Sequence, residues 1–347
     1  MEKMLKIGMP AGSLADPNRG GNLINLLMNS GFNVSGYAQG GPTKFTSVNY
    51  LFGWDGRPQE FGSQLAINEL DVAIAGDDWI RERVLEMKLE YGTDVSLERV
   101  LALNRGGVKL VGIIDSDEFN TAEEFLKDLC KQKKLITVVS EMPYLTLEWL
   151  RAKLDAIDML DHFKSFSVQK YKTPSKIETG IVIYETWGKT EAKIKNGGAD
   201  IGLEITQSGS AIKNYGLKII DTIMSSQTSI WIHPEVKKDG EKSDLLNMFL
   251  LNLYGSINAE NKMMLIFNVP NSIVGEIDFY LREKNLFADE PTVSAGKQFT
   301  VYNIQVDAAN KDEPLAKVRY ELAKRGATSI NTLPVQSSIP SIKVISD

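Results

Sequence analysis

Cysteine and histidine are scarce in this chain of 347 residues, which contains one cysteine, Cys130, and two histidines, His162 and His233. A single cysteine excludes an intrachain disulfide and any metal cluster built on cysteines. Two histidines that lie far apart in the sequence exclude a histidine-rich metal site. Any chemistry must therefore rest on carboxylates, hydroxyls, basic side chains and backbone groups.

A surplus of positive charge and long apolar runs are also lacking. The net charge of −6 and the isoelectric point near 5.3 argue against a general nucleic-acid or anionic-membrane binder. No apolar run approaches the roughly 18 residues that a membrane helix needs. Residues 1–5 lead into a strand without a secretory leader. We therefore expect a cytoplasmic protein whose partners include neither a nucleic acid nor a membrane.

Short apolar strands, separated by amphipathic helices, recur along the first 206 residues and indicate an α/β fold. Strands are expected at residues 4–10, 71–75, 108–114, 135–139, 181–184 and 200–206. In open α/β sheets, ligands bind at the carboxyl ends of the strands. Small and acidic residues follow positions 75, 139 and 206, so these three ends should converge on one cleft if the chain folds as two lobes.

Residues 35–63 are rich in glycine, proline, serine and aromatic residues, a composition that favours a hairpin or a long loop over a helix. Arg57 lies in this segment and could hold a phosphate bidentately, although a solvated surface arginine explains it equally well. After the strand at 71–75, Asp77 or Asp78 is expected to cap the next helix, in preference to binding Mg²⁺ or a hydroxyl group.

Residues 197–217 have the layout of a phosphate cradle, with an apolar strand, a turn of small residues and the start of a helix. In the turn, Ser208, Gly209 and Ser210 would point hydroxyl and N–H donors at an anion. Glu204 would repel phosphate but could accept hydrogen bonds from ribose hydroxyls, which favours a sugar phosphate as the ligand. Taken alone, the pattern is also that of a strand, a turn and a helix with a serine-rich N-cap.

From about residue 262 the pattern changes to a βαββαβ run of about 80 residues, which predicts a small ferredoxin-like domain. Its strands are expected at 263–269, 300–306 and 329–335, with an extra strand at 291–293. This segment carries no constellation of acid, base or nucleophile. A ligand-sensing or oligomerising role is therefore favoured for it.

Six segments, in the same order, resemble the long form of ATP phosphoribosyltransferase, the first enzyme of histidine biosynthesis, over essentially the full chain. LKIGMP matches the family's opening strand, RPQE its "RPxDIP" turn and LDVAIAG its "VDLGITG" strand. SEMPYLT resembles "TEYPNLT", and GKTE resembles "GSVE". The phosphate cradle resembles "ADAIxDxxxTGxTLxxNGL", the family's phosphoribosyl-pyrophosphate loop. Six ordered matches are far more specific than the loop alone.

The resemblance implies a bilobed catalytic core like a type II periplasmic-binding protein, followed by a C-terminal ferredoxin-like regulatory domain. Lobe I would comprise residues 1–108 and 224–260, lobe II residues 109–223, and the regulatory domain residues 261–347. It further implies Mg²⁺-dependent transfer of the 5-phosphoribosyl group from phosphoribosyl pyrophosphate to N1 of ATP. Inhibition by histidine and a homo-oligomer, hexameric or dimeric, are also implied.

The same resemblance assigns two sets of site residues, but it assigns no metal ligands. Glu204 would be the catalytic carboxylate. The set expected to bind phosphoribosyl pyrophosphate is Glu204, Gln207, Ser208, Gly209, Ser210 and Ala211. The set expected to bind the nucleotide is Gly12, Ser13, Arg57 and Glu141.

The chain departs from the family pattern at three of these positions. The family's "KGRL" is AGSL here, so Ser13 stands where a basic residue is expected. The final threonine of the loop is Ala211, and its aspartate is Glu204. These changes favour a second hypothesis, a non-catalytic paralogue that binds a nucleotide or an amino acid and regulates a partner. A third, a transport-type solute-binding protein, shares the bilobed fold but does not explain the sugar-phosphate loop.

Overall fold

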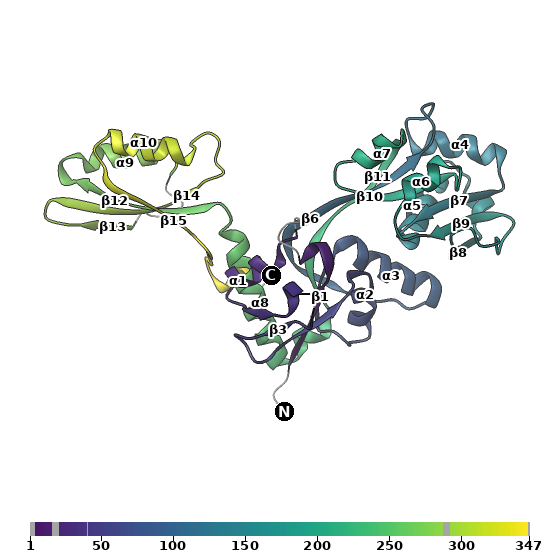
Figure 1. The fold of residues 1–347 in the computed structure, drawn as a ribbon, viewed down its shortest axis with the longest axis horizontal. Coiled ribbons are helices and arrows are strands. Elements are labelled where there is room, and N and C mark those ends of the chain that lie inside the picture. Colours follow the sequence, from purple (N-terminus) through teal and green to yellow (C-terminus); the bar gives the residue numbers. More distant parts are fainter. Residues whose placement is uncertain (1–3, 16–20, 40, 287–291, 346–347) are drawn as a thin grey trace. The chain divides into compact units, whose positions relative to one another are not determined.

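The computed structural model describes residues 4–15, 21–39, 41–286 and 292–345, drawn as a ribbon in Figure 1. The chain divides into two compact units. The first unit comprises residues 1–25 and 33–246, and the second comprises residues 26–32 and 247–347. The lobe and domain boundaries expected from the sequence stay a prediction.

The first unit is built on one mixed sheet of eleven strands, in the order β2-β3-β4-β1-β5-β11-β6-β10-β7-β9-β8. β1 runs parallel to β4 and β5, and β7 runs parallel to β9 and β10. The strands are β1 (Leu5–Pro10), β2 (Val34–Ser35), β3 (Lys44–Phe45), β4 (Leu51–Gly56), β5 (Val72–Gly76), β6 (Glu98–Ile114), β7 (Leu135–Ser140), β8 (Phe166–Lys170), β9 (Gly180–Glu185), β10 (Ile201–Thr206) and β11 (Lys218–Ile232).

The two halves of this sheet repeat one arrangement, which confirms a bilobed α/β core. In one half, β1 lies between β4 and β5, and β11 follows β5 in the antiparallel direction. In the other half, β7 lies between β9 and β10, and β6 follows β10 in the antiparallel direction. β6 and β11 also pair with each other from Glu98–Ile232 to Ile114–Lys218, so they are the strands that the two lobes share.

A carboxylate repeats at the same place in both lobes. Asp71, just before β5, accepts a hydrogen bond from the backbone N–H of Lys6 at 2.9 Å. Asp200, just before β10, accepts one from the backbone N–H of Thr137 at 2.8 Å. Each carboxylate thus satisfies a backbone donor of the neighbouring strand, and it helps to fix the register of a parallel strand pair.

The helices of the first unit cover this sheet. They are α2 (Pro58–Ala66), α3 (Asp77–Tyr91), α4 (Ala122–Gln132), α5 (Pro143–Asp155), α6 (Thr190–Lys195) and α7 (Ser210–Asn214), while α1 (Leu23–Asn29) and α8 (Gly240–Asn258) begin in this unit and continue into the second. The 3-10 turns among the described residues of both units are η1 (Gly12–Leu14), η3 (Tyr37–Gln39), η4 (Leu160–Phe163), η5 (Pro234–Lys238), η6 (Asn271–Ile273) and η7 (Ile342–Ile345). No helix in the described ranges is both long and apolar enough to cross a membrane.

The prediction of a hairpin or loop throughout residues 35–63 was wrong at its C-terminal end, where α2 begins. Pro58 occupies the first turn of α2, a position that proline tolerates because that N–H has no partner within the helix. Phe61 and Leu65, one turn apart, are fully buried in a cluster with Leu70 and Ile80. Burial of this apolar face outweighs the loop-forming composition around it.

The second unit contains a four-stranded antiparallel sheet in the order β13-β14-β12-β15. Its elements are β12 (Lys262–Pro270), α9 (Val274–Glu283), β13 (Thr292–Ala295), β14 (Phe299–Asp307), α10 (Leu315–Lys324) and β15 (Thr328–Pro334). This order and connectivity confirm the ferredoxin-like βαββαβ fold. Of the extra strand expected at 291–293, residue 291 lies outside the described residues.

The second unit has its own core. Phe267 of β12 stacks on Tyr302 of β14, with ring centroids 5.3 Å apart and an interplanar angle of 8°. Both rings are fully buried in a cluster with residues of α9 and α10. The C-terminal half of α8 also belongs to this unit, where Phe249 lies 5.2 Å from the ring of Phe32.

Candidate functional site

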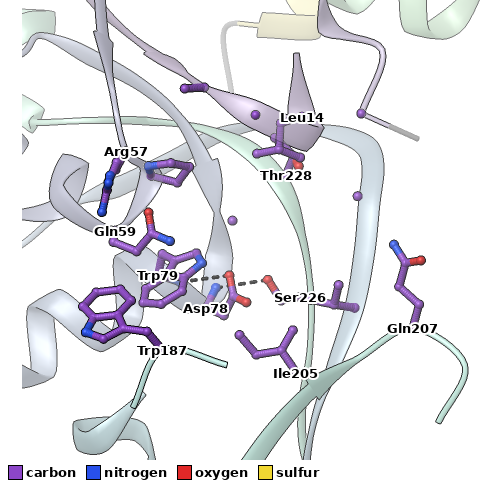
Figure 2. A pocket seen from close by; sticks show the side chains of 17 residues that line it. Leu14, Arg57, Gln59, Asp78, Trp79, Trp187, Ile205, Gln207, Ser226 and Thr228 are labelled. Carbon is purple, nitrogen blue, oxygen red and sulfur yellow. Dashed lines mark hydrogen bonds between the residues drawn. The ribbon is translucent and has the colours of Figure 1, made fainter. Parts of the chain in front are cut away.

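A cavity of about 520 Å³ lies where several strands of the first unit end (Figure 2). β1, β4 and β5 are parallel neighbours, so the segments that follow them meet at one edge of the sheet. The shared strands β6 and β11 supply another wall. The lining residues are Ala11, Gly12, Leu14, Gly21, Arg57, Pro58, Gln59, Gly76, Asp78, Trp79, Gly106, Val108, Trp187, Ile205, Gln207, Ser226 and Thr228.

Asp78 is the buried carboxylate of this cavity, with 4% of its surface exposed. Its own backbone N–H donates to Ser226 Oγ at 3.1 Å, and its Oδ1 accepts from the backbone N–H of Trp79 at 2.9 Å (Figure 2). Burial raises the pKa of Asp78 above its ordinary value, although hydrogen bonds donated to the carboxylate, the one from Trp79 foremost, act in the opposite direction. A ligand that donates a hydrogen bond here would therefore meet a poorly solvated acceptor.

The expectation that Asp77 or Asp78 caps α3 was wrong, because Gly76 is the N-cap residue. A Cβ atom on Gly76 would lie 2.3 Å from Asp78 Oδ1, so glycine is needed for this close approach. Asp77 instead accepts hydrogen bonds of 3.0 Å each from Arg99 and from the indole Nε1–H of Trp231. It thereby ties the start of α3 to β6 and β11.

Three of the residues assigned to the site from sequence lie together in this cavity, namely Gly12, Arg57 and Gln207. Gly12 opens the turn η1 after β1, and Arg57 is the extended N-cap residue of α2. Gln207 directly follows β10. For Ser13 the structure describes the backbone but not the side chain.

The phosphate cradle has the expected strand, turn and helix, formed by β10, residues 207–209 and the five-residue helix α7. Gly209 has a φ of 72° and donates its N–H to Thr206 Oγ1 at 2.9 Å. The exposed hydroxyls of Ser208 and Ser210 lie 2.9 Å apart. Of the assigned loop residues, Gln207 reaches the cavity lining, whereas residues 208–211 follow just beyond it.

Glu204 is the loop's carboxylate and lies partly buried on β10. Burial, followed by the negative charges of Glu191 and Glu141, raises its pKa from 4.5 to about 7. Its Oε2 atom is buried and finds no hydrogen-bond partner in the described part of the chain. A hydroxyl donor or a cation placed against this oxygen would therefore stabilise the ionised form.

Glu141 lies in a smaller neighbouring cavity of about 60 Å³, apart from the other residues assigned to the nucleotide. Burial raises the pKa of Glu141, while a hydrogen bond from the backbone N–H of Gly188 and the charge of Lys193 partly offset this. Trp79 and Trp187 line both the smaller and the larger cavity. The assigned nucleotide residues are therefore divided between two adjoining spaces.

Sequence reasoning missed Gln59, Trp79, Trp187, Ser226 and Thr228 as lining residues. Ser226 and Thr228 belong to β11, whose central residues are polar and give no apolar run to detect.

The structure also bears on the expectation of a bound metal ion. Within the described ranges, no group of three or more histidine, cysteine, aspartate or glutamate residues could hold a metal ion.

Comparisons with known proteins place these features in context. The family model "HisG: ATP phosphoribosyltransferase" matches residues 57–254, more than half of the chain. A protein of Desulfosudis oleivorans named ATP phosphoribosyltransferase is 26% identical over 345 residues, covering 98% of this chain and 100% of that protein. Its namesake from Geotalea uraniireducens is 24% identical over 352 residues, covering 98% of this chain and 100% of that protein.

Among solved structures, the ATP phosphoribosyl transferase (HisG:HisZ) complex from Thermotoga maritima contains a similar chain. It is 16% identical, with a TM-score of 0.49, and the match covers 72% of this chain and 96% of that chain.

Proposed function

Because the chain belongs to the ATP phosphoribosyltransferase family, we propose that it transfers the 5-phosphoribosyl group of phosphoribosyl pyrophosphate to N1 of ATP. This reaction is the first step of histidine biosynthesis. The observation that carries the proposal is the 520 Å³ cavity, in which Gly12 and Arg57 from the assigned nucleotide set meet Gln207 from the phosphoribosyl loop. One cavity is thus lined by residues assigned to both substrates.

The reaction forms a bond between N1 of the adenine and the anomeric carbon of the ribose, and it breaks the bond from that carbon to pyrophosphate. Pyrophosphate leaves with the electron pair, and the transition state carries oxocarbenium-like positive charge. Such a displacement needs positioning and electrostatic stabilisation more than a protein nucleophile. This requirement suits a chain whose cavity offers one carboxylate, two amides and two hydroxyls, from Asp78, Gln59, Gln207, Ser226 and Thr228.

Different residues would bind different groups of the two substrates. The exposed hydroxyls of Ser208 and Ser210, with the loop backbone around Gly209, would hold the 5-phosphate. Glu204, whose Oε2 is buried without a partner in the described structure, would accept the ribose hydroxyls. Arg57 would meet phosphate oxygens of the nucleotide. Ionised Glu204 would also stabilise the positive charge that develops on the ribose ring.

Mg²⁺ fits this site as a partner of the substrate. It prefers few protein carboxylates together with phosphate oxygens and water, so it would bind here mainly through the oxygens of pyrophosphate. The partnerless Oε2 of Glu204 is the protein oxygen best suited to contribute. When bound, the ion would neutralise charge on the leaving group.

The second unit would regulate the reaction, in a cytoplasmic homo-oligomer that is a hexamer or a dimer. Its separate ferredoxin-like fold and core support a role distinct from catalysis. Histidine, the end product of the pathway, would bind this unit and inhibit the enzyme. A coupling free energy of about 1–3 kcal/mol would give roughly 5- to 150-fold inhibition. A histidine titration that follows activity and thermal stability together tests this role, and stabilisation without a change in rate would contradict it.

Turnover is the decisive test of the proposed reaction. Mixing the protein with phosphoribosyl pyrophosphate, ATP and Mg²⁺ should produce the ultraviolet absorbance of N1-substituted adenine, and omission of any one component should abolish the signal. Substrate binding by calorimetry without turnover would contradict the reaction. That result would instead favour a non-catalytic paralogue, the alternative that Ser13 and Ala211 suggest.

A further inference from the structure

Trp187 exposes a large apolar surface beside the cavity. Trp187 is 65% exposed. Burial is the usual state of an indole, because it is one of the largest apolar side-chain groups in proteins. It lies in the turn between β9 and α6, where Gly188 and Lys189 both adopt positive φ angles of 77° and 62°. Single exposed apolar residues are common on protein surfaces. Trp187, however, also lines a cavity, so a ligand in that cavity could cover its exposed ring.

Trp79 bounds the same space from another element. It belongs to the first turn of α3, its backbone N–H is held by Asp78 Oδ1, and its ring packs against the large hydrophobic cluster of the first unit. Trp79 and Trp187 line both the 520 Å³ cavity and the 60 Å³ cavity beside it. Figure 2 shows both indoles on the side of the cavity where Gln59 lies, away from Gln207. The cavity therefore has an aromatic wall, which we define as Trp79 and Trp187.

Polar groups near this wall suit the edges of a purine. The Oε1 atom of Gln59 is buried and has no hydrogen-bond partner among the residues that the structure describes. Asp78 presents a buried carboxylate on the same cavity. The exocyclic amino group of adenine is a donor that such acceptors can satisfy, while the face of the base needs an aromatic or apolar partner.

We propose that the aromatic wall binds the adenine base of the nucleotide substrate by stacking, and that Trp187 sets the affinity for that base. This inference rests on the proposed function, since it assigns the base of the acceptor to one wall of the cavity. Trp79, fixed by its packing and its backbone hydrogen bond, supplies a preformed surface. Trp187 contributes exposed area that a bound base would cover.

The test compares ligands with and without a base, using the full-length protein and calorimetry. Trp187→Ala should weaken ATP binding by about 5- to 150-fold, the loss typical of one base–aromatic stack. Binding of inorganic tripolyphosphate and of phosphoribosyl pyrophosphate, which lack a base, should be unchanged. Trp187→Phe should restore most of the ATP affinity. In turnover assays, Trp187→Ala should raise the KM for ATP and leave the KM for phosphoribosyl pyrophosphate unchanged.

Tyr91→Ala is the matched control, because Tyr91 is 71% exposed at the end of α3 and lines neither cavity. It should bind every ligand as the wild type does. Equal ATP affinity in Trp187→Ala and the wild type would overturn the aromatic wall while leaving the proposed function intact. Equal loss for ATP and tripolyphosphate would also overturn it, because the base would then not be the group recognised. A wild type that neither binds ATP nor turns it over would overturn both proposals.

Discussion

Glu82 and Tyr144 are joined by a hydrogen bond of 2.9 Å, in which the backbone N–H of Tyr144 donates to Glu82 Oε1. The next N–H, of Leu145, donates to Oε2 at 2.8 Å. A carboxylate of α3 thus satisfies two donors at the start of α5, where the N-cap residue Met142 makes no side-chain capping bond. Asp78 lies in the first turn of the same α3, and Glu141 precedes α5, so this contact helps to fix the walls of both cavities.

Removal of the Glu82 carboxylate should destabilise the first unit. Glu82→Ala leaves two buried N–H groups unsatisfied, so we expect the free energy of unfolding to fall by about 2–4 kcal/mol. Glu82→Gln keeps one acceptor and should cost about 1–2 kcal/mol. Urea unfolding at pH 8, followed by circular dichroism, measures both losses. Glu148→Ala is the control, because its 2.6 Å ion pair with Arg81 is exposed and should be worth at most about 1 kcal/mol. Equal losses in Glu82→Ala and Glu148→Ala would contradict the capping role.

The stability of the protein should depend on pH through Glu204. Its pKa is raised from 4.5 to about 7, so between these values the folded state holds a proton that the unfolded state has lost. The resulting stabilisation is complete below pH 4.5 and is lost as the pH rises through 7. Glu204→Gln cannot ionise, so its stability relative to the wild type should increase from pH 5 to pH 8. Unfolding curves for both proteins at pH 5, 6, 7 and 8 give the difference between their free energies of unfolding. The contributions of the other titratable groups are the same in both proteins, so they cancel in this difference. A constant difference would show that Glu204 does not titrate in this window.

Glu204→Gln should also weaken binding of phosphoribosyl pyrophosphate while leaving the fold intact. Loss of a charged acceptor for ribose hydroxyls should cost about 1.5–3 kcal/mol, or roughly 10- to 150-fold in Kd. Calorimetry at pH 8, where Glu204 is largely ionised, is the appropriate measurement. Glu178→Gln, a change at an exposed glutamate, serves as the control and should bind normally. Unchanged affinity in Glu204→Gln would remove the sugar-hydroxyl role.

A basic residue introduced at position 13 should strengthen nucleotide binding. Ser13 directly follows Gly12 of the cavity lining and, by the resemblance to the "KGRL" pattern, stands where a basic residue is expected. Ser13→Arg would add a charge-assisted contact to phosphate, so we expect ATP affinity to rise about tenfold at low salt and less at high salt. Ser13→Gln controls for side-chain length without charge. If Ser13→Arg gives no gain and the wild type is already fully active, another basic residue such as Arg57 supplies the charge.

The fold was predictable where buried apolar runs coincide with strands. β5 is buried at Val72–Ala75 as its continuous apolar run indicates, and the βαββαβ order of the second unit follows from its alternating pattern. The site was predictable in part for the same reason, since parallel strands end at one edge and bring Gly12 and Arg57 together. The positions of these strands can be predicted from local sequence, because the apolar residues that form each strand are consecutive in the chain.

The remainder depends on contacts between distant segments. β11 is paired along its length with β6 and β5, so its polar centre is held by partners that no local pattern reveals. α2 forms because Phe61 and Leu65 find a buried surface on other elements. Trp187 is a cavity residue through the packing of the turn after β9, and nothing in its own neighbourhood distinguishes it from an ordinary surface tryptophan.

β11 also constrains the order in which the chain can fold as it leaves the ribosome. β5 pairs with β1 on one side and β11 on the other, yet β11 begins only at Lys218, after all the strands from β6 to β10 have been made. Until then the edge of β5 at Val72–Gly76 has no partner strand on that side. An apolar strand with a free edge is prone to pair with other chains. The lobe translated first is therefore the lobe completed last, and slow synthesis between residues 77 and 217 should favour aggregation of this protein.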